Sequence, residues 1–272
     1  MTEAPAKINL SLIVGPRRAD GKHEVLTVLE RVGLTDTVTV ERAPGGRSEV
    51  VGFPDDTIVR AALESLRDAA GCDTSFLVTI DKRIPLAAGL GGGSSDAAAA
   101  LRQANALLAS PLPDAELLRL GAGLGADVPF FLEDGTRLGS GDGSTLAPLT
   151  LPTGYVVVLW LPEGESKRST ADVYAAFDDR GGADGFAARR QALLDALAGV
   201  STVDDLADLP HNDLVTSPLS AELARLGAFR ADVTGAGPTL YGLFTDPDEA
   251  RRAAARLSRR GWAYATTTLE EG

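Results

Sequence analysis

The sequence has few of the residues that build disulfides or soft metal centres. It contains one cysteine, Cys72, and two histidines among 272 residues. A lone cysteine cannot form an internal disulfide, and so few soft ligands exclude a metal cluster of thiolates and imidazoles. Any metal ion is therefore expected to be one that prefers oxygen ligands, such as Mg²⁺.

Long apolar runs and an excess of basic residues are also missing. No stretch approaches the roughly 20 apolar residues of a membrane span, and residues 1–5 carry no apolar targeting segment. The 26 Lys and Arg against 38 Asp and Glu give a net charge of −12, which repels polyphosphate backbones. We therefore expect a cytoplasmic protein with small-molecule substrates and no nucleic-acid or membrane partner. A monomer and a homodimer both stay open.

Residues 85–100 have the most constrained composition of the chain and read PLAAGLGGGSSDAAAA. The glycines let backbone N–H groups converge on an anion. Ser94 and Ser95 are expected where a helix begins, with hydroxyls that can cap the helix or reach a phosphate or a metal ion. The free N–H groups and the dipole at a helix start also favour negative charge. The stretch therefore predicts a binding site for a nucleoside triphosphate.

A flexible linker is the alternative interpretation of a glycine run, but the flanking sequence argues against it. Residues 75–80 alternate like a strand, and apolar residues recur at helical spacing from Ala97 to Leu108. A strand, a glycine loop and a helix in this order indicate an ordered anion site. The loop lacks the Gly-Lys-Ser/Thr ending of a P-loop and departs from the dinucleotide-binding fingerprint, which disfavours both of those folds.

The pattern along the rest of the chain indicates an α+β protein with two domains, 1–150 and 151–272. Residues 4–14 alternate as a strand with Lys7, Asn9 and Ser11 on its polar face. Further strands are expected at residues 37–41, 75–80, 155–161, 239–244 and 262–267, and helices at residues 56–70, 97–108, 113–120, 171–177, 187–197, 218–226 and 247–259. The helix at residues 56–70 is expected to carry Val59, Ala62, Leu63 and Leu66 on one apolar stripe and to stop at Gly71.

Several of these segments together resemble the GHMP family of small-molecule kinases. The family's signatures are a lysine-bearing first strand, a Gly-Leu-Gly-x-Gly-Ser-Ser type loop and a carboxyl-terminal Gly-x-Gly-Pro loop. Matching blocks span nearly the whole chain, in order, at residues 5–10, 18–23, 80–85, 89–95, 125–129 and 234–239. The resemblance implies a two-domain fold, with an N-terminal ribosomal-protein-S5-domain-2-like βαβ nucleotide-binding domain, a C-terminal ferredoxin-like α/β sandwich and an active site in the cleft between them.

The blocks are most similar to family members that act in the non-mevalonate isoprenoid pathway. The resemblance implies transfer of the γ-phosphoryl group of ATP, with Mg²⁺, to the 2-hydroxyl of a cytidine diphosphate linked methylerythritol. Asp127 is then the base that takes the proton of the hydroxyl. Lys7 is its partner, because a nearby ammonium favours the ionised carboxylate, and Asn9 positions the substrate. Asp127 and Lys7 can also have purely structural roles: Asp127 can cap a helix, and Lys7 can be an ordinary lysine on an edge strand.

For ATP, the resemblance and the loop composition point to residues in and just before the glycine-rich stretch. Mg²⁺ is expected to arrive with ATP and to be reached by Ser94 or Ser95. Lys82 has an alternative role as a solvated charge at the end of a strand, and Asp56 stands where relatives often have an asparagine near the adenine. The predicted ATP-binding residues are Lys82, Pro85, Leu86, Ala87, Ala88, Gly89, Leu90, Gly91, Gly92, Gly93, Ser94 and Ser95.

For the acceptor, the resemblance points to two further regions. His23 is expected to bind a base edge and Tyr174 to stack on the base, although a surface histidine and a core-packing tyrosine are the alternatives. Relatives often have an aromatic residue where this chain has Lys22, so Lys22 is expected to lie over the ring or reach the diphosphate. The predicted substrate-binding residues are Asn9, Lys22, His23, Asp127, Thr170, Tyr174, Gly235 and Gly237, the last two on a loop that can also be a plain hairpin turn.

Two rival interpretations stay open. One is a GHMP kinase for another small alcohol, such as homoserine or mevalonate. The other is a nucleotide-binding regulator that keeps the glycine loop but transfers nothing. The Asp-Gly-x-His segment at residues 20–23 disfavours the first, and the presence of both Lys7 and Asp127 disfavours the second.

Overall fold

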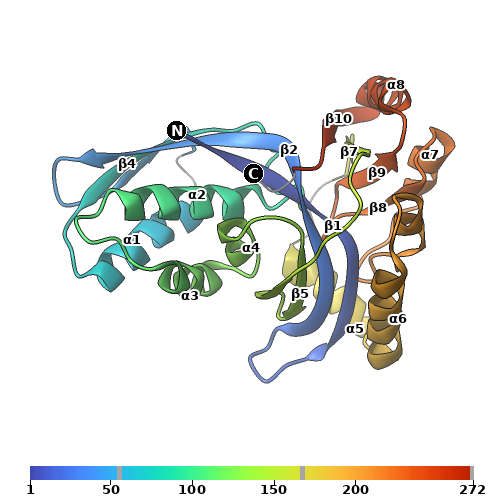
Figure 1. Cartoon of the computed structure of the whole chain (residues 1–272), viewed down its shortest axis with the longest axis horizontal. Helices are drawn as coiled ribbons and strands as arrows, with labels where there is room; N and C mark the ends of the chain where they lie inside the picture. Colours follow the sequence, from blue (N-terminus) through green and yellow to red (C-terminus); the bar gives the residue numbers. More distant parts are fainter. Residues whose placement is uncertain (54–56, 166–168, 270–272) are drawn as a thin grey trace. The chain divides into compact units, whose positions relative to one another are not determined.

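The computed structural model describes residues 1–53, 57–165 and 169–269 of the chain (Figure 1). Its strands and helices confirm the α+β class. The chain forms two compact units: the first holds residues 1–6, 34–86 and 91–134, and the second holds residues 7–33, 87–90 and the remainder from residue 135. Neither unit is one continuous stretch, whereas the expected domains 1–150 and 151–272 are continuous. The division into these two domains stays a prediction.

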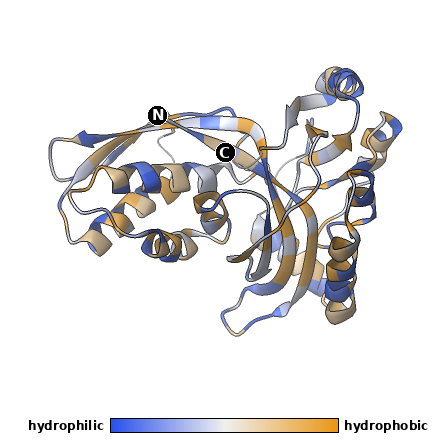
Figure 2. Ribbon diagram, in the orientation of Figure 1, coloured by the Kyte–Doolittle hydropathy of each residue, from blue (hydrophilic) through white to orange (hydrophobic). Residues whose placement is uncertain are grey.

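Two long strands contribute residues to both units. β1 spans Thr2–Arg17, β2 spans His23–Ala43, and the two strands pair. The predicted strand at residues 4–14 is confirmed, but both of its faces are buried: Lys7, Asn9 and Ser11 are at most 4% exposed. Figure 2 accordingly shows β1 and β2 coloured largely as hydrophobic in the second unit. The predicted polar face therefore lies inside the protein.

The first unit places helices beside a small sheet. β4 (Ser75–Asp81) pairs antiparallel with the second half of β2 and parallel with β3 (Glu49–Val51). Its helices are α1 (Ile58–Ala70), α2 (Gly92–Ala106), α3 (Asp114–Leu124) and α4 (Val128–Leu132). Helix α2 packs against α1 and α4, and its buried alanines allow these close contacts. The strand, glycine stretch and helix predicted for this region are confirmed.

Helix α1 shows how local sequence sets the ends and faces of an element. The expected apolar stripe is the buried face of the helix, made of Val59, Ala62, Leu63 and Leu66. Gly71 ends the helix in the left-handed region, at φ 59°, a conformation that glycine adopts without a steric penalty. The predicted stop at Gly71 is therefore confirmed.

The second unit contains a four-stranded antiparallel sheet. Its strands follow the order β10 (Gly261–Thr267), β7 (Val156–Pro162), β9 (Leu240–Phe244) and β8 (Arg230–Val233). Helix α8 (Pro247–Leu257) packs on β7, β9 and β10 over a core that includes Trp160 and Phe244. The remaining elements are β5 (Arg137–Gly141), β6 (Thr145–Pro148), α5 (Thr170–Asp179), α6 (Phe186–Gly199), η1 (Asp204–Asp208), α7 (Ser220–Arg225) and η2 (Ser258–Arg260).

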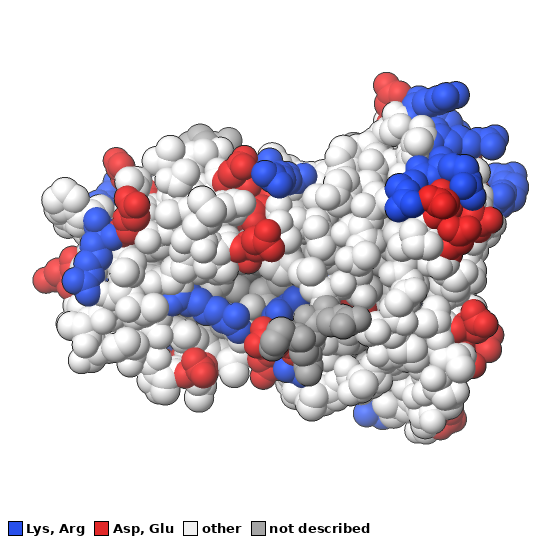
Figure 3. Space-filling model, turned by 45° about the horizontal axis from the view of Figure 1, so that its top comes forward, with Lys and Arg blue, Asp and Glu red and all other residues white. Residues whose placement is uncertain are grey.

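The charge of the second unit is uneven. Although the chain carries a net charge of −12, α8 and η2 expose five arginines: Arg251, Arg252, Arg256, Arg259 and Arg260. Basic side chains gather over this part of the surface in Figure 3. Among the described residues, no helix is both long and apolar enough to cross a membrane.

A buried carboxyl group in β2 makes stability depend on pH. Glu30 is 3% exposed and accepts a hydrogen bond of 2.5 Å from the hydroxyl of Tyr155. Burial raises the pKa of Glu30 to about 7, and the bond from Tyr155 opposes this only in part. Because folding raises this pKa, the folded state holds the proton more tightly than the unfolded chain does.

Glu30→Gln is therefore expected to become more stabilising as pH rises. In the wild type, the contribution of protonated Glu30 to the free energy of unfolding is fully present below about pH 4.5 and is lost as pH rises through 7. The full loss is about 3 kcal/mol. Urea unfolding of the wild type and the variant at pH 5 and pH 8 measures this difference, most of which falls between those values. Glu41→Gln, on the exposed part of the same strand, is the control. A stability gap that stays constant with pH would contradict the prediction.

Candidate functional site

The glycine-rich stretch enters α2 earlier than the sequence indicates. The helix begins at Gly92, and Gly91 is its N-cap in the left-handed region, at φ 73°. Ser94 and Ser95 thus lie within the first turn, and no side chain among the described residues caps the helix. The serines lie where the helix begins, as the sequence predicts, but the N-cap is Gly91, in a left-handed conformation that serine does not readily adopt. The uncapped N–H groups of this turn remain suited to an anion.

The preceding residues, 87–90, belong to the second unit and pack against the loop that joins β8 to β9. Gly89 has a φ of 82°, and a Cβ added to it would lie 2.8 Å from the carbonyl oxygens of Thr234 and Gly237. The N–H of Thr239 donates to the carbonyl oxygen of Ala88 over 3.3 Å. The β8–β9 loop is thus a hairpin connection, which is one of the two roles expected for it. It also fixes part of the glycine-rich stretch.

Lys7 and Asn9 lie against the same loop. The Nζ of Lys7 donates to Oδ1 of Asn9 over 2.7 Å, and the backbone N–H of Lys7 donates to the carbonyl oxygen of Leu90 over 2.9 Å. A Cβ on Gly235 would lie 3.5 Å from Nζ of Lys7 and 3.4 Å from Oδ1 of Asn9. Lys7 is buried, which does not fit a solvated edge-strand lysine. The structure therefore brings Lys7, Asn9, Gly89 and Gly235 together.

Three residues that were not among the predicted site residues hold this group in place. Thr27 accepts a hydrogen bond of 2.8 Å from the side-chain amide of Asn9. The hydroxyl of Thr234 accepts a hydrogen bond of 3.1 Å from the backbone N–H of Asn9. Asn212 donates 2.7 Å to the carbonyl oxygen of Gly235. Thr234 directly precedes the Gly-x-Gly-Pro block and Asn212 opens an Asn-Asp-Leu run, so adjacency to these motifs was the available signal.

Asp127 stands at the N-cap of α4 in the first unit. It is half-buried, and its side chain makes no capping hydrogen bond to the helix. The capping alternative thus lacks the bond that would define it. Lys7 belongs to the second unit, and its pairing with Asp127 stays a prediction.

The glycine-rich stretch offers few side-chain oxygen atoms to the expected Mg²⁺. The hydroxyl of Ser95 is buried and has no hydrogen-bond partner among the described residues, while Ser94 is half-buried. In the described ranges, no group of three or more His, Cys, Asp or Glu side chains is arranged to hold a metal ion. These residues fit an ion that takes most of its oxygen ligands from a triphosphate and at most one or two from serine hydroxyls.

The residues predicted for the cytidine lie together in the second unit. The rings of His23 and Tyr174 are stacked, with centroids 4.6 Å apart, and Nε2 of His23 lies 2.8 Å from Oδ1 of Asp178. Val173 and Phe177 of α5 anchor this group in a core shared with β1 and β2. Thr170 is exposed at the start of α5. His23 and Tyr174 thus each use one ring face to stack on the other.

Lys22 takes part in an ion pair with the turn between β5 and β6. Its Nζ lies 2.5 Å from Oδ2 of Asp142. Burial alone would raise the pKa of Asp142, but hydrogen bonds from Lys22 and Ser144 outweigh it and lower the pKa to about 2. The carboxylate of Asp142 therefore keeps its charge across the physiological pH range. The predicted contacts of Lys22 with the base or the diphosphate stay predictions.

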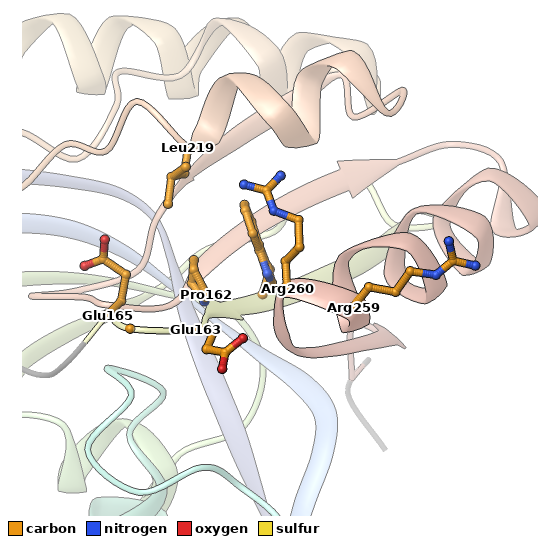
Figure 4. A pocket seen from close by; sticks show the side chains of 8 residues that line it. Pro162, Glu163, Glu165, Leu219, Arg259 and Arg260 are labelled. Carbon is orange, nitrogen blue, oxygen red and sulfur yellow. The ribbon is translucent and has the colours of Figure 1, made fainter.

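One cavity of the second unit lies apart from the predicted site residues. It has a volume of about 380 Å³ and lies beside η2, and Arg260 is one of its lining residues (Figure 4). The guanidinium carbon of Arg260 lies 5.7 Å from the ring centroid of Trp160, which also lines the cavity. None of the predicted site residues lines it. Asp56, expected near the adenine, lies outside the described residues.

Comparisons with known proteins agree with these features. The family model of the GHMP kinases N terminal domain matches residues 57–135, and that of the GHMP kinases C terminal region matches residues 217–262. A 4-diphosphocytidyl-2-C-methyl-D-erythritol kinase of Nocardioides sp. is 40% identical over 95% of this chain and 93% of its own length. The kinase of the same name from Syntrophotalea carbinolica is 37% identical over 98% of both chains.

Solved structures show the same relationship. A crystal structure of 4-(cytidine 5'-diphospho)-2C-methyl-D-erythritol kinase matches with a TM-score of 0.79 and 33% identity, covering 100% of this chain and 99% of that one. A mevalonate kinase structure matches with a TM-score of 0.75 at 13% identity, covering 99% of both chains, which shows the fold alone. This chain therefore belongs to the GHMP kinase family and, within it, to the family of 4-diphosphocytidyl-2-C-methyl-D-erythritol kinases.

Proposed function

We propose that this protein transfers the γ-phosphoryl group of ATP to the 2-hydroxyl of 4-diphosphocytidyl-2-C-methyl-D-erythritol. The observation that carries the proposal is the similarity, at 34–40% identity over most of the chain, to kinases named for this substrate. The non-mevalonate isoprenoid pathway is then the setting of the reaction.

For ATP, the proposal uses the glycine-rich stretch from Pro85 to Ser95. The uncapped N-terminus of α2 and the left-handed glycines at residues 89 and 91 leave backbone N–H groups available for phosphate oxygens. Mg²⁺ would neutralise charge on the triphosphate, with Ser94 or Ser95 as the protein's contribution. This arrangement supports binding without a lysine of the P-loop type.

For the transfer, Asp127 accepts the proton of the attacking hydroxyl and Lys7 keeps that carboxylate ionised. Phosphoryl transfer asks the protein mainly to position the reactants and to stabilise charge. The buried bond between Lys7 and Asn9 supports positioning, because it fixes both side chains beside Gly235. Asn9, Gly235 and Gly237 are then the residues that orient the acceptor.

For the cytidine, the proposal uses His23 and Tyr174, with Lys22 and Thr170 beside them. An aromatic ring that already stacks on a neighbour can accept a base on its other face or exchange one stacking partner for another. The bond between His23 and Asp178 supports this role, since it orients the imidazole.

The test is the formation of ADP with a panel of alcohols. We expect ADP from ATP and Mg²⁺ when 4-diphosphocytidyl-2-C-methyl-D-erythritol is present, and only background release with homoserine or mevalonate. Phosphorylation of homoserine or mevalonate instead would favour a GHMP kinase for another alcohol. Binding of ATP with no ADP from any acceptor would favour the non-catalytic regulator and refute the proposal.

A further inference from the structure

Lys82, just past the end of β4, lies between two buried aspartates. Its Nζ donates 2.7 Å to Oδ2 of Asp96 and also donates to Oδ2 of Asp36. Both aspartate side chains are 0% exposed, and that of Lys82 is 14% exposed. The ring of Phe53 lies 5.9 Å from the ammonium. The ammonium of Lys82 is thus paired with carboxylates inside the first unit and is largely shielded from solvent.

Asp36 also binds the backbone that leads toward the glycine-rich stretch. Its Oδ1 accepts hydrogen bonds from the N–H of Arg83 over 2.6 Å and from the N–H of Ile84 over 2.8 Å. A buried carboxylate with three donors is well satisfied and fixes each of them. Asp36 therefore sets the path of the chain directly before Pro85.

The same cluster contacts the start of α2 from the other side. Asp96 belongs to this helix, and a Cβ added to Gly92 would lie 3.3 Å from Nζ of Lys82 and 3.1 Å from Cγ2 of Ile84. Asp36, Lys82 and Asp96 thus connect the segment before the glycine-rich stretch with the helix after it. The three residues come from β2, the end of β4 and α2, respectively.

The charges in this cluster do not balance when both carboxyl groups are ionised, because one ammonium faces two carboxylates. Burial raises the pKa of Asp96 to about 7; Lys82 opposes this shift and Asp36 adds to it. Oδ1 of Asp96 is buried and has no hydrogen-bond partner among the described residues. Removing one member of such a buried group leaves the others unpaired, so each depends on the rest.

We propose that Asp36, Lys82 and Asp96 are positioning residues for ATP, which hold residues 83–92 so that the backbone of the glycine-rich stretch meets the phosphates, and that Lys82 itself does not contact the nucleotide. This role rests on the proposed function, because it assumes that the stretch binds ATP. It replaces the direct contact between Lys82 and ATP that the sequence predicts.

The test separates an indirect role of Lys82 from a direct one by measuring the Kd of a nonhydrolysable ATP analogue. Lys82→Met and Asp96→Ala are each expected to raise this Kd about tenfold. The Kd of the double variant is expected to equal that of the single variant that binds more weakly, because both substitutions break the same cluster. Asp96→Asn keeps an acceptor for Lys82 and is expected to stay within about threefold of the wild type.

A direct contact predicts different results. Asp96→Ala frees the ammonium, so it would leave the Kd unchanged or lower it while Lys82→Met raises it, and this outcome would overturn the proposal. A multiplicative loss of about 100-fold in the double variant would overturn it as well. Asp81→Asn removes an exposed charge next to Lys82 and serves as a control with an unchanged Kd.

Steady-state kinetics then distinguish positioning from a general loss of structure. We expect the KM for ATP to rise with the Kd, while kcat and the KM for the cytidyl substrate stay within about twofold. An equal rise in both KM values would overturn the proposal. A wild type that binds the analogue but phosphorylates no acceptor would refute only the proposed function, whereas a wild type that does not bind the analogue would refute both.

Discussion

Asp127→Asn is expected to lower kcat about 10³-fold, the range that the loss of a general base produces. The substitution removes the proton acceptor and keeps the size of the side chain. Asparagine is as good a helix cap as aspartate, so the stability of α4 is expected to stay the same. Turnover measured as ADP release, together with urea unfolding, therefore separates a catalytic role from a capping role.

The matched control for this prediction is Asp114→Asn, which removes an exposed carboxylate from the first turn of α3 in the same unit. Its kcat is expected to stay within about twofold of the wild type, although the helix can lose about 0.5 kcal/mol of dipole stabilisation. If Asp127→Asn keeps wild-type turnover, or loses turnover only in proportion to lost stability, Asp127 is not the base.

Gly89→Ala is expected to have the second largest effect, lowering kcat/KM for ATP about 100-fold, as a displacement of order 1 Å in a positioning segment can do. The residue has a φ of 82°, and a Cβ would lie 2.8 Å from two backbone carbonyl oxygens. Neither oxygen belongs to a flexible side chain, so the loop itself must move. Strain of this kind also lowers the free energy of unfolding, by about 1–3 kcal/mol.

Gly123→Ala is the control for this glycine. Residue 123 lies in α3 with no atom within 4 Å of an added Cβ, and alanine there is expected to stabilise the helix by up to about 1 kcal/mol without affecting turnover. Measurement of kcat/KM for ATP and of urea unfolding for both variants checks the pair. Wild-type kinetics in Gly89→Ala would show that residues 87–90 tolerate displacement and would refute their role in ATP binding.

Elements with a strong local pattern could be predicted from the sequence. The stripe of α1, its stop at Gly71, and the helices at residues 171–177 and 187–197 follow from periodicity and capping, and the structure confirms them. β2 is the counterexample: a strand was expected only at residues 37–41, whereas it begins at His23. Both faces of residues 25–30 are largely buried, so the alternation that marks a half-exposed strand is missing there.

The sequence by itself determined the family, the glycine-rich stretch and the candidates Lys7 and Asp127, because each depends on residues that are adjacent or form ordered motifs. Only the tertiary structure decided what surrounds them. Asp36 meets Lys82 across 46 positions, and Thr234 meets Asn9 across 225. Such contacts leave no periodic signal in the chain, since they depend on how strands pair and where loops close, and the packing of the whole unit decides both.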